Sequence, residues 1–319
     1  MPADVFGRAR SSAPGCALTI GNFDGVHRGH QSMLALLKNE ALHRGLPACV
    51  MTFEPHPREF FTPSQAPARI ATLRDKLTEL ARCGIDQTLV MPFNAALASQ
   101  PPEQFIRQVL VEGLGAQYVL VGDDFRFGAK RAGDYAMLDA AGERFGFDVA
   151  RMRSYEVHGL RVSSSAVRAA LANGQMQEAA KLLGRPYTLS GHVVHGRKLG
   201  RELGFPTLNL RLHTPRPAAS GIFAVQVLGL GERPVHGVAN LGVRPSLGAD
   251  DANRGQVLLE TYCLAWPQGL GAQGGYGKII SVELLHKLHD ELKYDGLEAL
   301  KTGIHQDCDA ARAWFAGRI

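Results

Sequence analysis

Two histidines within a glycine-rich segment are the residues best suited to chemistry in the first half of this sequence. The segment is Gly21-Asn22-Phe23-Asp24-Gly25-Val26-His27-Arg28-Gly29-His30, which follows a short apolar run and opens a helical pattern. His27 and His30 are three residues apart, so a helix places both on one face, where both can donate to phosphate oxygens. Backbone N–H groups at a helix N-terminus also bind phosphate, and Gly25 allows close approach. Such donors could stabilise charge on a transferred nucleotidyl group and on its pyrophosphate leaving group. Two surface histidines on an amphipathic helix explain the spacing alone at least as well.

Three further segments of the first half carry candidate binding residues. Arg161-Val162-Ser163-Ser164-Ser165-Ala166-Val167-Arg168 combines hydroxyl groups with a guanidinium fork for phosphate, although an ordinary helix cap would also explain the serines. Phe53-Glu54-Pro55-His56-Pro57 and Val121-Gly122-Asp123-Asp124-Phe125-Arg126-Phe127-Gly128 both follow candidate strands. Ligands of parallel sheets bind beyond the carboxyl ends of strands, so both segments are candidates for ligand contacts. A strand-ending turn explains the first of them equally well.

A basic, glycine-rich run dominates the chemistry of the second half. It extends over residues 191–209 and ends in Pro206-Thr207-Leu208-Asn209. Its backbone amides can surround phosphates, and the hydroxyl of Thr207 and the amide of Asn209 can bring oxygen atoms to a cation. The candidate phosphate-binding residues are Gly196, Arg197, Gly200 and Arg201. Taken alone, the run could also be a turn-rich loop.

The first half must position its candidate residues on a parallel sheet. Short apolar runs alternate with helix-length amphipathic segments, which is typical of βαβ units. The predicted strands are residues 17–20, 48–53, 87–91, 118–121 and 147–152. The predicted helices are residues 31–44, 73–82, 102–112 and 135–145, followed by 164–173 and 176–183. We therefore predict a doubly wound α/β domain over residues 1–184, ending at Gly184-Arg185-Pro186.

The pattern of apolar segments changes in the second half of the sequence and predicts a β domain over residues 185–319. Short alternating segments are separated by glycine and proline, which favours a small antiparallel barrel or sandwich. The predicted strands are residues 187–194, 221–228, 234–238, 257–264 and 278–285, and a helix is predicted over 297–315. The fold class is therefore α/β plus β.

Composition restricts the classes of partner. The chain has 319 residues, 45% of them hydrophobic, and contains no apolar run long enough for a membrane span. Its N-terminus has no secretory pattern, so we expect a cytoplasmic protein. The net charge of +5 would suit polyanions, but the basic residues are scattered, and we expect no nucleic-acid partner. Five widely spaced cysteines without a CxxC pair indicate reduced, structural thiols.

The segments together resemble one enzyme family. The histidine segment matches the HxGH motif of the nucleotidylyltransferases, and the serine segment resembles their triphosphate-binding loop. The combination with the second half resembles the bacterial bifunctional riboflavin kinase/FAD synthetases. This resemblance implies that riboflavin is phosphorylated to FMN by ATP, and that FMN is then adenylated to FAD. It places His27 and His30 on the ATP phosphates, Ser164, Ser165 and Arg168 over pyrophosphate, and Phe53, Pro55, Asp124, Arg126 and Phe127 near flavin or adenylate.

The same resemblance assigns roles in the second half. Residues 206–209 match the PTAN motif with Leu208 in place of Ala, which implies that Thr207 and Asn209 hold Mg²⁺. Glu260 stands where the family carries its catalytic Glu, which acts as base or orienter for the ribityl hydroxyl. Asn240, Arg244 and Glu291 are implied on the flavin side. Two departures fall near that side: His289 stands where relatives often have Arg, and Gly274-Gly275 where they have an acidic loop.

Three other readings compete with this one. A fragment of a class I aminoacyl-tRNA synthetase would share the HxGH motif but leave Thr207, Asn209 and Glu260 without a role. A flavin-binding protein without turnover would be expected to lack some of these groups. Loss of one activity would affect the kinase half first, because both departures lie there. The sequence leaves the oligomeric state open, and a monomer is one of the possibilities.

Overall fold

The structure is a computed structural model, and it describes residues 15–152, 156–157, 160–196, 203–212, 214, 216–243, 257–271 and 273–317. The chain forms two compact units. The first unit consists of Met1–Pro67 and Lys76–Val162, and the second of Ala68–Asp75 and Ser163–Ile319. A short piece of the N-terminal half therefore belongs to the second unit.

The first unit is built on a five-stranded parallel sheet with strand order β3-β2-β1-β4-β5. The strands are β1 (Cys16–Ile20), β2 (Ala48–Glu54), β3 (Gln87–Pro92), β4 (Ala116–Gly122) and β5 (Asp148–Met152). The helices are α1 (Arg28–Arg44), α2 (Pro57–Phe61), α4 (Ala95–Ala98), α5 (Pro102–Phe105), a π-helix (Ile106–Gly113) and α6 (Tyr135–Phe145). Two 3-10 turns (Pro63–Gln65 and Ala129–Arg131) and the hairpin of β6 (Glu156–Val157) and β7 (Leu160–Arg161) complete the described elements. Helix α3 (Leu73–Arg82) begins in the second unit and continues into the first.

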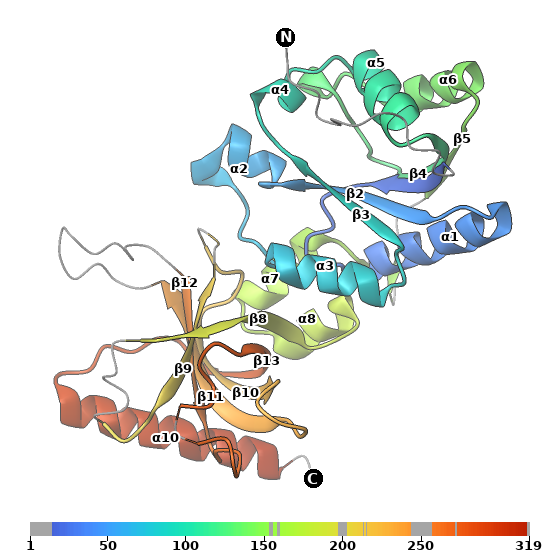
Figure 1. Ribbon diagram of the computed structural model, residues 1–319. Helices are drawn as coiled ribbons and strands as arrows, with labels where there is room; N and C mark the ends of the chain where they lie inside the picture. The colour runs from blue at the N-terminus through green and yellow to red at the C-terminus, as the bar shows by residue number, and fades with distance from the viewer. Residues whose placement is uncertain are drawn as a thin grey trace. The chain divides into compact units, whose positions relative to one another are not determined.

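Apolar side chains cover both faces of this sheet. Helices α1 and α3 lie on one face, where Leu34 and Leu80 pack with Val50 of β2 (Figure 1). Helices α5 and α6 and the π-helix lie on the other face, where Leu110 and Leu138 meet residues of β1 and β4. Since both faces are buried, the strands read as apolar runs rather than as alternating patterns.

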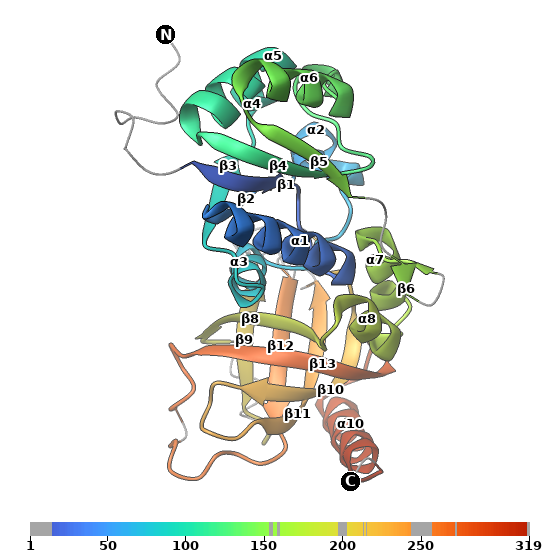
Figure 2. The ribbon, with the colours of Figure 1, turned by 90° about the vertical axis from the view of Figure 1, so that its right-hand side faces the viewer.

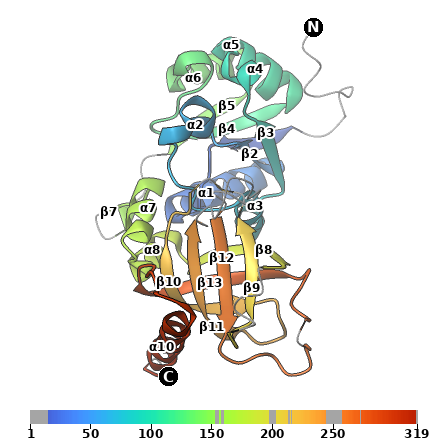
Figure 3. The same cartoon turned by 90° about the vertical axis from the view of Figure 1, so that its left-hand side faces the viewer.

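The second unit contains a closed antiparallel barrel with strand order β10-β11-β12-β9-β8-β13. Its strands are β8 (Tyr187–Val194), β9 (Thr207–Leu212), β10 (Gly221–Leu228), β11 (Val235–Val243), β12 (Val257–Cys263) and β13 (Ile279–His289). Helices α7 (Ser164–Ala172) and α8 (Met176–Leu183) precede it, and α10 (Leu297–Ala316) follows it. Helix α10 runs along the outside of β10 and β11 (Figure 2), and β12, β9 and β8 are neighbours in the wall (Figure 3).

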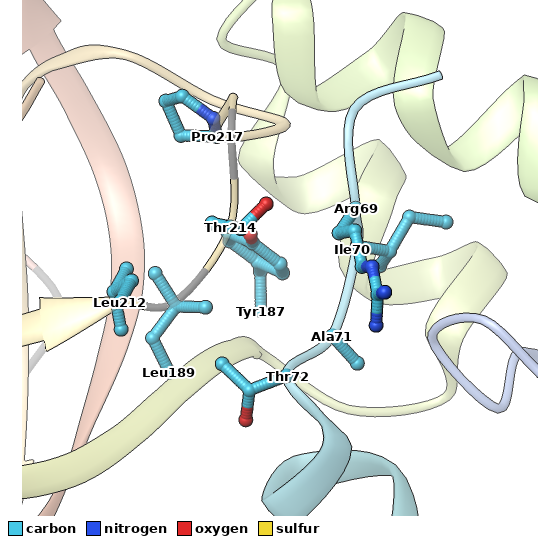
Figure 4. Close-up of a pocket in the computed structure, with 9 residues that line it drawn as sticks. All are labelled: Arg69, Ile70, Ala71, Thr72, Tyr187, Leu189, Leu212, Thr214 and Pro217. Carbon is cyan, nitrogen blue, oxygen red and sulfur yellow. The ribbon is translucent and has the colours of Figure 1, made fainter. Parts of the chain in front are cut away.

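The segment Ala68–Asp75 packs on the second unit although it precedes most of the first unit in sequence. Ile70 is 2% exposed and lines a small pocket together with Leu189 and Leu212 (Figure 4). The carboxylate of Asp75 accepts a short hydrogen bond from the Ser190 hydroxyl. The second unit is therefore discontinuous in the sequence.

The predicted fold class is confirmed, with differences in detail. The barrel settles the choice between barrel and sandwich. Strand β9 was not predicted, because its first residues were assigned to the basic, glycine-rich run that could be a loop, although its polar and apolar residues alternate strictly. The helix predicted over 102–112 consists of α5 and the π-helix, which the apolar spacing does not distinguish.

Candidate active sites

The loop between β1 and α1 has an unusual backbone. Phe23 and Val26 have positive φ angles of 48° and 41°, and Gly25 has a φ of 80°. A positive φ is rare for a β-branched residue such as valine, and strained residues of this kind cluster at binding sites. The side chains of Phe23 and Val26 are fully buried in the core below, which holds the loop in this conformation. Any contact of Phe23 with a nucleotide would therefore come from its backbone.

His27 forms the N-cap of helix α1. Its Nδ1 atom accepts the backbone N–H of His30 at 3.3 Å, so the proton of a neutral ring lies on Nε2. The rings of His27 and His30 are stacked, with centroids 3.6 Å apart. A Cβ added at Gly29 would lie 3.2 Å from the His27 ring and 3.2 Å from the carbonyl oxygen of Val162, so only glycine fits easily. The rings of the two histidines therefore lie side by side at the N-terminus of α1, as the spacing predicts.

The other predicted residues of the first unit lie at neighbouring strand ends. The order of strands reverses between β1 and β4, and ligands of such sheets bind at this switch point. Asp124 and Arg126 follow β4 and are exposed, and Arg126 forms an ion pair of 3.2 Å with Asp134. Phe127 is buried, and its ring packs against Phe105. A flavin contact of Phe127 stays a prediction.

An aromatic cluster after β2 and β3 was not anticipated from the sequence. Phe53 lies edge-on to Phe93, with centroids 5.8 Å apart, and Phe60 and Phe61 each lie 5.6 Å from Phe93. Phe61 is 61% exposed, which is high for a phenylalanine in a folded protein. The sequence signal was the Phe60-Phe61 pair in a short helix, α2, directly after the predicted Phe53 and Pro55. Exposed aromatic rings at the ends of β2 and β3, the strands next to β1 and its loop, suit a flat aromatic ligand.

The serine segment lies at the start of helix α7 in the second unit. Ser163 is the N-cap and accepts the N–H of Ala166, so the cap is one residue earlier than Ser164 and Ser165. Arg168 donates from Nε to the carbonyl oxygen of Ala68 at 2.7 Å. The predicted contact of these residues with pyrophosphate remains a prediction.

The barrel brings Asn209, Glu260 and Asn240 into one row across three neighbouring strands. Glu260 in β12 pairs with Asn209 in β9 on one side and with Asn240 in β11 on the other. Residues paired in this way share a face of the sheet. The alternate residues of β12, such as Leu259 and Thr261, are fully buried, so they fill the barrel and the row faces outward.

Two oxygen atoms of this row are unusual. Oδ1 of Asn209 and Oδ1 of Asn240 are buried and have no hydrogen-bond partner among the described residues. The Nδ2 group of Asn209 donates to the carbonyl oxygen and the hydroxyl of Thr207, which leaves Oδ1 directed elsewhere. A buried acceptor without a partner is costly, and an oxygen-seeking cation or a ligand donor would remove that cost.

The start of the basic run lies against the same row. A Cβ added at Gly196 would lie 2.6 Å from Asn209 Nδ2, so glycine is required for this approach. Phe205 is buried against Tyr262 and His305 and fixes the chain just before Thr207. The predicted residues Arg197, Gly200, Arg201 and Arg244 lie outside the described residues.

The comparisons with known proteins cover both units. Family models described as FAD synthetase and riboflavin kinase match residues 9–166 and 183–315. Bifunctional riboflavin kinase/FMN adenylyltransferases from Pseudomonas fluorescens and Haemophilus influenzae are 46% and 44% identical to this chain. The first match covers 95% of this chain and 94% of the relative, and the second covers 94% of each. This chain belongs to the bifunctional riboflavin kinase/FMN adenylyltransferase family.

A solved structure agrees with the fold of this bifunctional enzyme. A crystal structure titled as a macrolide-efflux protein from Streptococcus pneumoniae is 25% identical and covers 95% of both chains, with a TM-score of 0.71. The efflux title describes that protein, and the likeness supports the fold here. A synthetase fragment, in contrast, would not match the kinase family in its second half. In the described part of the chain, no helix has the length and apolar character to cross a membrane.

The departures from the family pattern have local explanations. A Cβ added at Gly275 would lie 2.7 Å from Cδ2 of Leu208, so a glycine here leaves room for the leucine that replaces the usual Ala. His289 is held between the carboxylate of Asp307 and the carbonyl oxygen of Asp290, both at 2.7 Å. Predicted Glu291 lies against Gly242 of β11, two residues from Asn240.

Proposed function

We propose that the two activities of the family are divided between the N-terminal part of this chain, residues 1–184, and the C-terminal part, residues 185–319. As a member of the family, the chain phosphorylates riboflavin to FMN with ATP and adenylates FMN to FAD. We assign adenylation to residues 1–184 and phosphorylation to residues 185–319. The observation that carries the kinase assignment is the row of Asn209, Glu260 and Asn240 with its two buried amide oxygens.

For adenylation, the proposed site is the loop over residues 21–30. The FMN phosphate attacks the α-phosphorus of ATP, and the bond to pyrophosphate breaks. Nε2 of His27 can donate to a phosphate oxygen because Nδ1 accepts from the backbone. The stacked ring of His30 and the positive end of the α1 dipole favour the charge that develops on the departing pyrophosphate. The aromatic cluster of Phe53, Phe60, Phe61 and Phe93 supports the flavin ring.

For phosphorylation, Glu260 is the proposed base. It accepts the proton of the ribityl hydroxyl as the oxygen attacks the γ-phosphorus, and ADP departs. Oδ1 of Asn209 and the hydroxyl of Thr207 are oxygen ligands of the kind that Mg²⁺ prefers, so these residues fit the cation. When bound there, Mg²⁺ neutralises charge on the ATP phosphates. Asn240 and Glu291 stand on the flavin side of the row.

The deciding experiment is a chromatographic time course with riboflavin, ATP and Mg²⁺. We expect FMN to appear first and to be converted to FAD. His27→Ala should lower FAD formation from FMN about 10²–10³-fold and leave FMN formation unchanged. Glu260→Ala should lower FMN formation about 10²–10⁴-fold and leave adenylation of added FMN unchanged.

The two variants serve as controls for each other. A folded variant that loses both activities would show that the division between residues 1–184 and residues 185–319 is wrong. Riboflavin left untouched by the wild-type chain, with FMN still adenylated, would restrict the chain to FAD synthesis.

The remaining expectations concern partners and location. We propose that the chain works in the cytoplasm on small molecules, as a monomer, without nucleic-acid or membrane partners. The scattered basic residues support this proposal. Gel filtration with light scattering tests the monomer directly.

A further inference from the structure

Lys76 is a buried cation that no part of the proposed mechanism uses. It lies in α3, its residue exposure is 3%, and no other Lys or Arg of the described residues is buried. Burial of a charged ammonium costs several kcal/mol unless hydrogen bonds and favourable charges offset it. A lysine on the surface would have avoided this cost, so its position needs a reason.

Hydrogen bonds connect Lys76 to the loop over residues 21–30, the proposed ATP site. Its Nζ donates to the hydroxyl of Thr52 at 3.2 Å, and this hydroxyl donates to the carbonyl oxygen of Asn22 at 3.1 Å. Thr52 is fully buried near the end of β2, and Asn22 is the second residue of the loop after β1. Lys76 also lies one helical turn before Leu80, which packs beneath the loop with Phe23.

The buried polar residues of the first unit gather in this one region. They are Thr19, Asp24, His27, Thr52 and Lys76, taken over the described residues. Thr19 and Thr52 lie near the carboxyl ends of β1 and β2, and Asp24 and His27 lie in the loop itself. Buried polar residues are therefore concentrated around the proposed phosphate site, and Lys76 is the one Lys or Arg among them.

We propose that Lys76 is a positioning residue for adenylyl transfer. Through Thr52 it fixes the carbonyl of Asn22 and thereby the strained loop that presents His27. This inference rests on the proposed assignment of residues 21–30 to ATP.

The test compares Lys76→Met and Lys76→Arg in the full chain. Lys76→Met keeps the apolar stem and removes the charge, whereas Lys76→Arg keeps the charge. Adenylation of added FMN is measured over a range of ATP concentrations, at a temperature well below the thermal transition seen by circular dichroism. Riboflavin phosphorylation by the same sample reports the amount of intact protein. Lys38→Met, an exposed lysine of α1, is the matched control.

We expect Lys76→Met to lower kcat/KM for ATP in adenylation about 10²-fold, the size of effect that displacement of a reacting group by about 1 Å produces. Lys76→Arg should recover at least part of this loss, and Lys38→Met should match the wild type. Thr52→Val removes the hydroxyl between Lys76 and Asn22 at constant volume and should lower kcat as well. This second variant decides the question if Lys76→Met does not fold.

Two results would overturn the inference. Folded Lys76→Met with wild-type kcat and KM but a lower melting temperature would make Lys76 a structural residue only. Wild-type rates for Thr52→Val would break the proposed link to Asn22. His27→Ala measured in parallel separates this failure from that of the site: if His27→Ala is also fully active, the loop does not bind ATP as proposed.

Discussion

Asn209 illustrates how a single buried atom can indicate a ligand. Its Nδ2 group is satisfied by Thr207, while its Oδ1 is buried without a partner in the described part of the chain. If Asn209 served only to stabilise the fold, an apolar side chain of similar size in its place would make the protein more stable, because it would bury no unpaired oxygen. The orphaned oxygen therefore favours a functional role, in agreement with its place beside Glu260.

We expect Asn209→Ala to weaken the use of Mg²⁺ by the kinase. The variant removes the buried oxygen but leaves Glu260 in place, so the Mg²⁺ concentration for half-maximal FMN formation should rise at least about 10-fold. Titration of Mg²⁺ at saturating ATP and riboflavin measures this shift. Adenylation of added FMN in the same sample should keep its Mg²⁺ dependence. An unchanged Mg²⁺ requirement for phosphorylation would remove Asn209 from the metal site.

The sequence allows some of the proposed site residues to be predicted but not others. His27 and His30 could be proposed from their spacing in the sequence, and Thr207 and Glu260 from the resemblance to the family. Lys76 could not, since a lysine in an amphipathic helix usually faces solvent, and its burial becomes visible only in the folded unit.

At the scale of elements, apolar periodicity predicts most of the strands and helices but not which strands pair with each other. The pattern over 257–264 predicts a strand, yet it does not say that Glu260 lies opposite Asn209 and Asn240. Register depends on contacts between segments that are distant in the sequence. The contacts of Phe60 and Phe61 of α2 with Phe93, which follows β3, were missed for the same reason, because these residues meet only when the sheet forms.

The junction of β13 and α10 should respond to pH. Burial alone would lower the pKa of His289, but hydrogen bonds to Asp307 and to the Asp290 carbonyl, with the charges of both carboxylates, raise that pKa overall. The folded state therefore holds the proton more tightly than the unfolded state. The resulting stabilisation is complete below the unfolded pKa of histidine and is lost as pH rises through the folded value.

We expect the unfolding free energy of the second unit to fall by less than about 1 kcal/mol between about pH 6 and about pH 8.5, because His289 is partly exposed. The chain has two tryptophans, Trp266 and Trp314, and both belong to this unit. Urea titrations followed by tryptophan fluorescence therefore report on it selectively. Asp307→Asn should flatten the pH dependence, and an unchanged slope would contradict the assignment to this pair.

At the scale of the whole molecule, the order of the sequence and the order of the units differ. The segment Ala68–Asp75 lies between two parts of the first unit in sequence, yet Ile70 packs on Leu189 and Leu212, and Asp75 binds Ser190. Composition placed the domain change at Gly184 because the pattern of strands changes there. It could not show that eight earlier residues complete the other unit, since their apolar content does not identify what covers them.

This arrangement predicts that a substitution early in the chain destabilises the barrel unit. Ile70→Ala should leave a cavity beside Leu189 and lower the unfolding free energy of the second unit by about 2–5 kcal/mol. Tryptophan fluorescence in urea would then show an earlier transition, although both tryptophans lie almost two hundred residues or more beyond the substitution. Leu110→Ala, an equally buried change in the first unit, is the control and should leave this transition in place. If Ile70→Ala left the transition unchanged while Leu110→Ala moved it, the segment would belong energetically to the first unit, and the discontinuous second unit would have to be abandoned.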